Sequence, residues 1–162
     1  MLSPGFLDWV KNNDFKNSNI LEIGSGNSTL FFSKYFKQVY SFEDNKEWFN
    51  NLILKGLPFN VDLQLFDVNI FKDLNFQRKV FESNVILIDN NPNNIPREEF
   101  TYFIHKNKNP NSIIILDNGD WNYCAYEFLR SHYYCHDFLR KDPTENFKIT
   151  QTTIFYHPRI KN

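Results

Sequence analysis

The chain has 162 residues, 41% of them hydrophobic and 23% charged, which is the composition of a globular protein of about one domain. The formal net charge is −1, from 18 basic and 19 acidic residues, so the strong basic excess of a typical nucleic-acid-binding protein is excluded. No stretch approaches the roughly 20 apolar residues of a membrane span, and residues 1–15 hold no apolar run of signal-peptide length. We therefore expect one cytoplasmic domain over residues 1–162, with no nucleic-acid or membrane partner.

Apolar runs alternate with amphipathic segments along the chain, which is typical of a parallel sheet covered by helices. Short apolar runs predict strands at residues 20–23, 39–42, 61–66, 85–88, 113–116, 135–139 and 148–157. Helical spacing and end signals predict helices at residues 28–36, 44–56, 96–107 and 120–132. The predicted fold class is α/β, a Rossmann-like three-layer αβα sandwich. Its seven-stranded sheet is mostly parallel, with an antiparallel strand near the C-terminus in a hairpin that turns around Pro143.

Acidic residues stand at the ends of five predicted strands: Glu22, Glu43, Asp67, Asp89 and Asp117. In an open α/β sheet, ligands bind outside the carboxyl ends of the strands. Helix capping accounts for some of these acids, and Asp67 in particular, but a row of five favours a binding site at this edge of the sheet.

The segment from Ile20 to Thr29, with the sequence ILEIGSGNST, is the most informative part of the chain. Two of the five glycines, Gly24 and Gly26, lie between a strand and a helix, where glycine permits a tight turn and close approach of a ligand to the backbone. An acid precedes the first glycine by two positions, and another acid ends the following strand. This arrangement predicts a cofactor-binding loop.

The segment resembles motif I of the class I S-adenosylmethionine-dependent methyltransferases, in particular small-molecule and hypothetical methyltransferases that read Leu-Glu-x-Gly-Ser-Gly-x-Ser-Thr. The resemblance implies that the acid of motif I and the glycine loop hold the methionine end of the cofactor. It also implies that the acid ending the second strand binds the ribose hydroxyls and that the acid of the third strand lies near the adenine amino group. The implied cofactor-binding residues are Glu22, Gly24, Ser25, Gly26, Ser28, Glu43 and Asp67.

Two other functions remain open. A dinucleotide-binding loop usually keeps a third glycine where this chain has Ser28, and it carries no acid before the loop, which disfavours an NAD(P)-dependent oxidoreductase. A non-catalytic module or subunit that keeps the cofactor pocket is the other alternative. The favoured hypothesis is an enzyme of the EC 2.1.1 type that transfers a methyl group to an oxygen or nitrogen of a small molecule.

Asp89 and Asp117 are the predicted catalytic residues, as candidates for a general base where the acceptor must lose a proton. Together with Asn118 they also resemble the oxygen ligands of magnesium-dependent O-methyltransferases, where acids at the ends of the fourth and fifth strands hold the cation. Solvated or capping carboxylates are the favoured interpretation of this group, so magnesium stays a weaker hypothesis. The sequence does not predict the acceptor or the oligomeric state.

Overall fold

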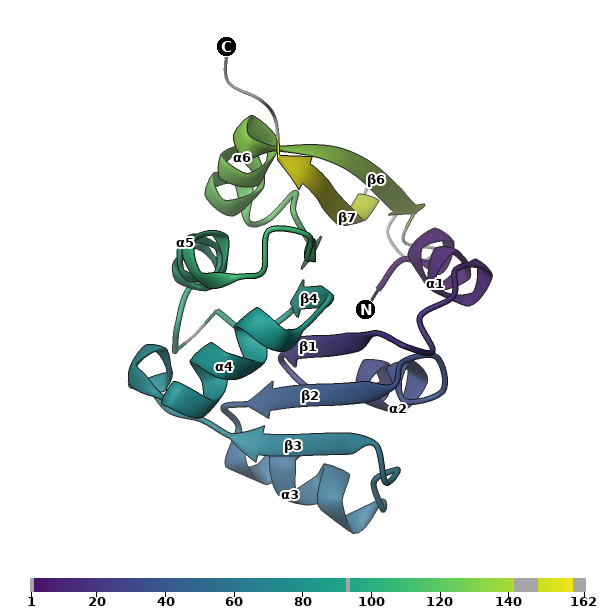
Figure 1. Ribbon diagram of the computed structural model, residues 1–162, viewed down its shortest axis with the longest axis vertical. Helices are drawn as coiled ribbons and strands as arrows, with labels where there is room; N and C mark the ends of the chain where they lie inside the picture. Colours follow the sequence, from purple (N-terminus) through teal and green to yellow (C-terminus); the bar gives the residue numbers. More distant parts are fainter. Residues whose placement is uncertain (1, 93, 142–148, 159–162) are drawn as a thin grey trace.

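A computed structural model describes residues 2–92, 94–141 and 149–158. Within this part, one sheet contains seven strands in the order β3-β2-β1-β4-β5-β7-β6 (Figure 1). Strands β1 to β5 run parallel to one another, and β7 runs antiparallel to both β5 and β6. The strands are β1 (Asn19–Ile23), β2 (Gln38–Glu43), β3 (Val61–Leu65), β4 (Val85–Ile88), β5 (Ile113–Asp117), β6 (Tyr133–Lys141) and β7 (Ile149–Pro158). The predicted fold class is confirmed, while the expected turn around Pro143 lies outside the described residues.

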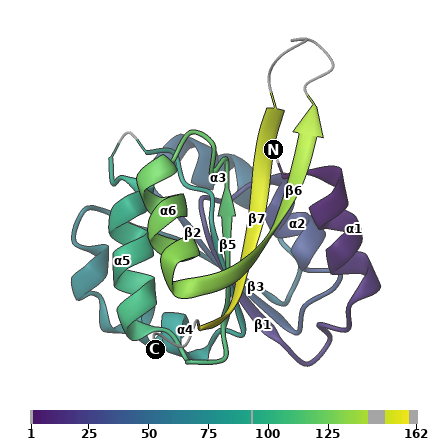
Figure 2. The same ribbon diagram turned by 90° about the horizontal axis from the view of Figure 1, so that it is seen from above.

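Helices cover both faces of the sheet, as Figures 1 and 2 show. They are α1 (Pro4–Asn12), α2 (Asn27–Phe32), α3 (Lys46–Leu54), the 3-10 helix η1 (Ile70–Lys72), α4 (Leu74–Glu82), α5 (Arg97–Asn107) and α6 (Tyr123–His132). One apolar cluster joins α4, α5 and α6 to the sheet, and a second joins α1 and α2 to the opposite face. None of the helices in the described ranges has the length and apolar character needed to cross a membrane.

Alternation of side chains along the central strands explains the two apolar clusters. In β4, Ile86 and Ile88 point to the face covered by α4, α5 and α6, whereas Val85 and Leu87 point to the face covered by α1 and α2. Both faces are buried, so the strand is a continuous apolar run. The carboxyl ends of β1, β2 and β4 therefore meet at one edge of a rigid sheet.

Two helices occur where the sequence analysis assigned none. Helix α1 begins after Ser3, whose side chain accepts a hydrogen bond from the Phe6 N–H, and Pro4 occupies its first turn. Helix α4 begins after Asp73, whose side chain accepts hydrogen bonds from the N–H groups of the first turn. The first residues of both helices follow ordinary capping rules. The sequence therefore contained a capping signal for each helix, although the spacing of its apolar residues did not reveal it.

Candidate functional site

A cavity of about 1010 Å³ lies at the carboxyl ends of β1, β2 and β4, beside the beginning of the chain. It is lined by the loop after β1, the first residues of α2, the segment joining β2 to α3, the loop after β4, and two leucines near the N-terminus. The lining residues are Leu2, Leu7, residues 24–28, Phe31, residues 43–48, Asp89, Asn91 and Asn94. The structure thus brings five of the seven predicted cofactor-binding residues and one predicted catalytic residue to the same cavity.

The two glycines of the glycine loop, residues 24–26, have different surroundings. One is packed against the tip of β4, and the other leaves space for a ligand. Gly24 has a φ of +91°, and a Cβ at this position would lie 2.6 Å from the carbonyl oxygen of Asp89. Its N–H donates to the Phe42 carbonyl at 2.8 Å. Gly26 is extended, and a Cβ there would meet nothing closer than the Trp48 indole nitrogen at 3.9 Å. Gly24 is therefore required by the fold, whereas Gly26 leaves its side of the cavity open.

Glu43, the last residue of β2, is 5% exposed and is held rigidly at the cavity wall. Its Oε2 accepts hydrogen bonds from the Ser25 N–H at 2.9 Å and the Ser25 hydroxyl at 2.7 Å. Its Oε1 accepts a hydrogen bond from the Asn45 N–H at 2.9 Å. The carboxylate joins the glycine loop to the start of α3, and Oε1 keeps acceptor capacity for a further donor.

Glu22 is fully buried and does not line the cavity. Its Oε2 accepts hydrogen bonds from the hydroxyl groups of Thr29 at 2.5 Å and Ser41 at 2.9 Å. Thr29 in turn accepts a hydrogen bond from the Gly26 N–H at 2.9 Å. Burial raises the pKa of Glu22 to about 7. Glu22 therefore supports the glycine loop from beneath, and the structure does not bring it to the ligand side.

Asp89 lines the cavity at the tip of β4 and pairs with Arg97, whose Nη2 lies 3.1 Å from Oδ1. Arg97 is 5% exposed; its Nε donates to the Asn90 carbonyl at 2.8 Å and its Nη1 to the Asp117 carbonyl. Burial, followed by the neighbouring Asp117 carboxylate, raises the pKa of Asp89 to about 7, although Arg97 acts in the opposite direction. The sequence analysis missed Arg97. Its spacing from Phe100 and Ile104 places it on the buried face of α5, and a charged residue on a buried face is the signal that could have identified it.

Asp117 is 1% exposed and is not among the residues that line the cavity. Its Oδ1 accepts a hydrogen bond from the Thr152 hydroxyl of β7 at 2.5 Å, and Thr152 Oγ1 accepts one from the Ser3 N–H at 3.0 Å. The next residue, Asn118, has a φ of +51° and accepts hydrogen bonds from the turn that leads into α6. Asp117 thus joins β5 to β7 and to the start of the chain.

The magnesium hypothesis gains no support from this geometry. Residues 2–92, 94–141 and 149–158 contain no group of three or more His, Cys, Asp or Glu side chains that could hold a metal ion. One oxygen of each proposed carboxylate ligand is already bonded within the protein, Asp89 Oδ1 to Arg97 and Asp117 Oδ1 to Thr152.

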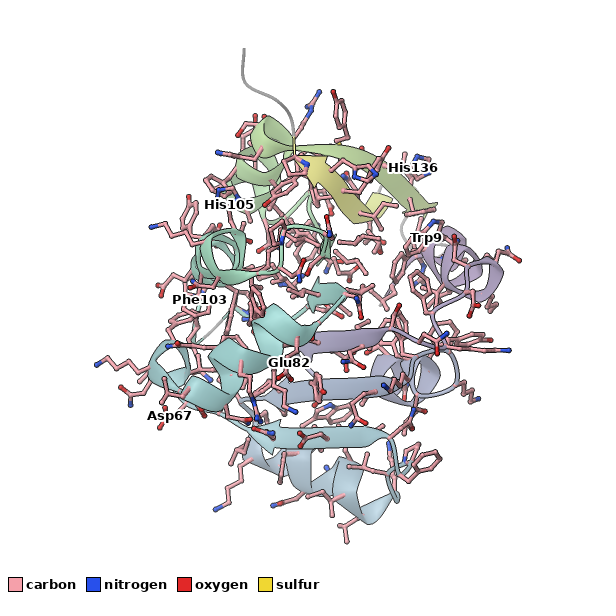
Figure 3. All side chains as sticks on the ribbon, in the orientation of Figure 1. Trp9, Asp67, Glu82, Phe103, His105 and His136 are labelled. Carbon is pink, nitrogen blue, oxygen red and sulfur yellow. The ribbon has the colours of Figure 1, made fainter. Side chains whose placement is uncertain are left out.

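Asp67 lies outside the cavity, is exposed, and accepts a hydrogen bond from the Asn69 N–H at 2.8 Å. Figure 3 shows it beyond the carboxyl end of β3, an edge strand of the sheet. Its predicted place beside an adenine ring remains a prediction to which the cavity lining adds nothing.

Two of the lining residues that the sequence analysis did not assign to the site connect its walls. The Trp48 indole N–H donates to the Ser25 carbonyl at 2.7 Å, which fixes the ring beside the glycine loop. The Asn94 side-chain amide donates to Asp44 Oδ2 at 2.8 Å and connects the loop after β4 to the segment after β2. No local motif marks either residue, because each acts through a contact distant in sequence.

Comparison with known proteins gives matches in structure. No protein-family model and no curated protein matches the sequence. The O-methyltransferase of Bacillus cereus in complex with S-adenosylhomocysteine has a TM-score of 0.69 and 15% identity, over 96% of this chain and 82% of that chain. The O-methyltransferase TomG of Streptomyces achromogenes, involved in tomaymycin synthesis and in complex with S-adenosylmethionine, has a TM-score of 0.66 and 14% identity, over 97% and 82%. An rRNA methylase of Streptococcus thermophilus has a TM-score of 0.62 and 14% identity, over 94% and 95%. The chain therefore has the Rossmann-like fold of the class I methyltransferases.

Proposed function

We propose that the chain forms one S-adenosylmethionine-binding domain over residues 1–162 and catalyses methyl transfer to an oxygen or nitrogen of a small molecule. The observation that carries this proposal is the cavity at the carboxyl edge of the sheet, where the glycine loop and Glu43 lie together. The fold is shared with methyltransferases whose structures hold S-adenosylmethionine or S-adenosylhomocysteine.

The chemistry of the cavity fits this cofactor. S-adenosylmethionine carries a sulfonium cation, an ammonium, a carboxylate and a ribose diol, and it has no phosphate. The cavity presents four carboxylates, from Glu43, Asp44, Glu47 and Asp89, against one ammonium, from Lys46. This balance favours a cationic ligand and disfavours the pyrophosphate of NAD(P). It also disfavours a polyanionic acceptor such as RNA, although one structural neighbour is an rRNA methylase.

Each group has a distinct role in the proposed mechanism. Glu43 would accept hydrogen bonds from the ribose hydroxyls, and Gly24 to Gly26 would lie against the methionine portion, with Glu22 fixing the loop from below. When bound, S-adenosylmethionine supplies an electrophilic methyl group. Asp89 would accept the proton of an acceptor that must lose one, and Arg97 and Asp117 would position it. The main contribution of the protein would be orientation of the two reactants.

Ligand binding tests the proposal and separates it from the alternatives. We expect S-adenosylhomocysteine to raise the melting temperature and to give a saturable calorimetric titration, while NADH does neither. A response to NADH alone would support an oxidoreductase. Binding of S-adenosylhomocysteine without methyl transfer from labelled S-adenosylmethionine to a broad panel of phenols, carboxylic acids and amines would support a non-catalytic module.

A further inference from the structure

A second cavity, of about 470 Å³, lies at the opposite edge of the sheet from the first. Helices α5 and α6 end here, β6 begins here and β7 ends here (Figure 2). Among the residues that the structure describes, its polar lining consists of His105, Lys106, Lys108, His132 and Tyr133 and includes no carboxylate. In a protein with a net charge of −1, this is a local concentration of cationic and hydrogen-bond-donating groups.

Lys108 is the unusual member of this set, because it is only 8% exposed. Its ammonium donates to the carbonyl groups of Asn109 at 3.0 Å and Pro110 at 3.1 Å and lies 5.2 Å from the centre of the Tyr133 ring. None of the salt bridges among the described residues includes it. Burial lowers the pKa of Lys108, as expected for a cation without a nearby opposite charge.

Lys79 provides a comparison within the same molecule. Its ammonium lies 3.6 Å from the centre of the Tyr40 ring, as that of Lys108 lies over Tyr133, and its side chain is 11% exposed. Lys79 has a carboxylate beside it, since Asp62 Oδ2 lies 3.7 Å away. Two lysines that both lie beside a tyrosine ring thus differ in whether a described residue supplies a counter-charge.

The two histidines extend the cationic lining towards α6. The His105 Nδ1 lies 2.9 Å from the Tyr133 hydroxyl, and the His132 Nδ1 lies 2.8 Å from the Phe128 carbonyl, so both rings are fixed. Their ring centres are 4.6 Å apart. Figure 3 shows His105 on the side of α5 that faces α6. Favourable interaction with the helix dipoles accounts for basic residues in the last turns of α5 and α6 and for a cation at Lys108, the C-cap of α5, but it does not account for the burial of the Lys108 side chain.

We propose that this second cavity binds a small oxyanion of the phosphate or phosphomonoester class, with Lys108 as its principal cationic contact. An oxyanion would supply the counter-charge that Lys79 obtains from Asp62 and would accept hydrogen bonds from several donors at once. The site is separate from the proposed methyl-transfer cavity and does not depend on it.

Titration with inorganic phosphate, followed by proton NMR of the imidazole resonances at constant ionic strength, tests this site in the whole protein. Of the other histidines, His136 lies within β6 and outside the lining, so it serves as the internal reference. We expect saturable shifts for His105 and His132 and none for His136. Equal shifts of these three residues, or no saturation at millimolar phosphate, would overturn the proposal.

Two variants sharpen this experiment. Lys108→Met should weaken phosphate binding about tenfold or more, because a charge-assisted hydrogen bond is lost, whereas Lys79→Met should leave it unchanged. If Lys108→Met does not fold, the exposed residue Lys106 replaces it, and Lys106→Gln should still weaken binding measurably. Equal affinities for the wild type and the folded lining variant would also overturn the proposal.

Discussion

Glu22 and Glu43 show how two acids at the ends of neighbouring strands acquire different roles. Glu22 pairs in register with Ser41, and its carboxylate accepts hydrogen bonds from hydroxyl groups in the layer between the sheet and α2. Glu43, the last residue of β2, reaches the cavity and accepts hydrogen bonds from the N–H groups of the loops around it. The first therefore acts on the glycine loop, and the second is placed to contact the ligand.

Replacing Glu43 tests its contact with the cofactor. We expect Glu43→Ala to weaken S-adenosylhomocysteine binding by about 1–3 kcal/mol, because charge-assisted hydrogen bonds to the ribose would be lost. Isothermal titration calorimetry measures this change. Glu99→Ala is the matched control, since Glu99 is exposed, lies outside the cavity and should have little effect on binding. Unchanged affinity in a folded Glu43→Ala variant would assign Glu43 a structural role alone.

The raised pKa of Glu22 predicts that the free energy of unfolding depends on pH. Its native pKa of about 7 lies above the value of about 4.3 in an unfolded chain, so the native state binds more protons between these values. The free energy of unfolding should therefore fall as pH rises from about 4.3 to 7 and level off above that range. Asp89 contributes in the same direction.

Urea unfolding at pH 4.5 and pH 7.5 checks this prediction. We expect Glu22→Gln to reduce the loss of stability between the two pH values by on the order of 2–4 kcal/mol. Glu99→Gln, at an exposed position, should behave as the wild type. Equal pH dependence in the wild type and Glu22→Gln would show that Glu22 ionises normally.

At the scale of elements, the glycine loop and the tip of β4 are built as one unit. The Gly24 backbone passes so close to Asp89 and Asn90 that a methyl group has no space. Arg97, from α5, then connects the tip of β4 to the tip of β5 through the Asn90 and Asp117 carbonyls. The position of Asp89 in the cavity thus depends on contacts from β1, β5 and α5.

Two glycines with positive φ separate backbone strain from steric crowding. Gly56, at the end of α3, has a φ of +80° and no atom within 4 Å of the position that a Cβ would occupy, so Gly56→Ala should cost about 1–2 kcal/mol of stability. Gly24→Ala carries the same strain and also displaces the backbone of Asp89, which should cost about 1–3 kcal/mol more. Chemical unfolding of both variants measures the difference, and equal losses would show that the two loops do not crowd each other.

At the scale of the whole molecule, the site draws on segments from both ends of the chain. Thr152 of β7 donates to Asp117 and accepts a hydrogen bond from the Ser3 N–H. Leu2 and Leu7 close one wall of the cavity. The antiparallel β7 therefore connects the carboxyl edge of the parallel strands to the beginning of the chain.

As the proposed general base, Asp89 should determine how turnover depends on pH. Because a base must be ionised, turnover should rise with pH and level off above about 7, the pKa of Asp89. Asp89→Asn should lower turnover by about two to four orders of magnitude with little change in S-adenosylhomocysteine affinity. A chelator should leave turnover unchanged, because Arg97 and Thr152 already bond to one oxygen of each carboxylate proposed for magnesium. Steady-state kinetics checks all three results; loss of activity with chelator and recovery with magnesium would restore the metal hypothesis.

The layers, most of the strands and the edge of the sheet that carries the cavity could be predicted from the sequence alone. These features are local, since a strand such as Val85–Ile88 is a continuous apolar run and Gly24 and Gly26 lie directly after another strand. Helices α1 and α4 were missed because their segments are short and their caps are weak signals beside the apolar runs.

Which acids face the cavity became evident only from the packing of the folded chain. Glu22, Asp67 and Asp117 satisfy the same pattern as Glu43 and Asp89, yet the first three do not line the cavity. A residue's orientation depends on the twist of the sheet and on partners distant in sequence, such as Thr152 for Asp117. For the same reason neither the role of Arg97 nor the cavity around Lys108 was predicted. The contacts of Arg97 and the walls of that cavity form only when helix ends and strand tips from separate parts of the chain pack together.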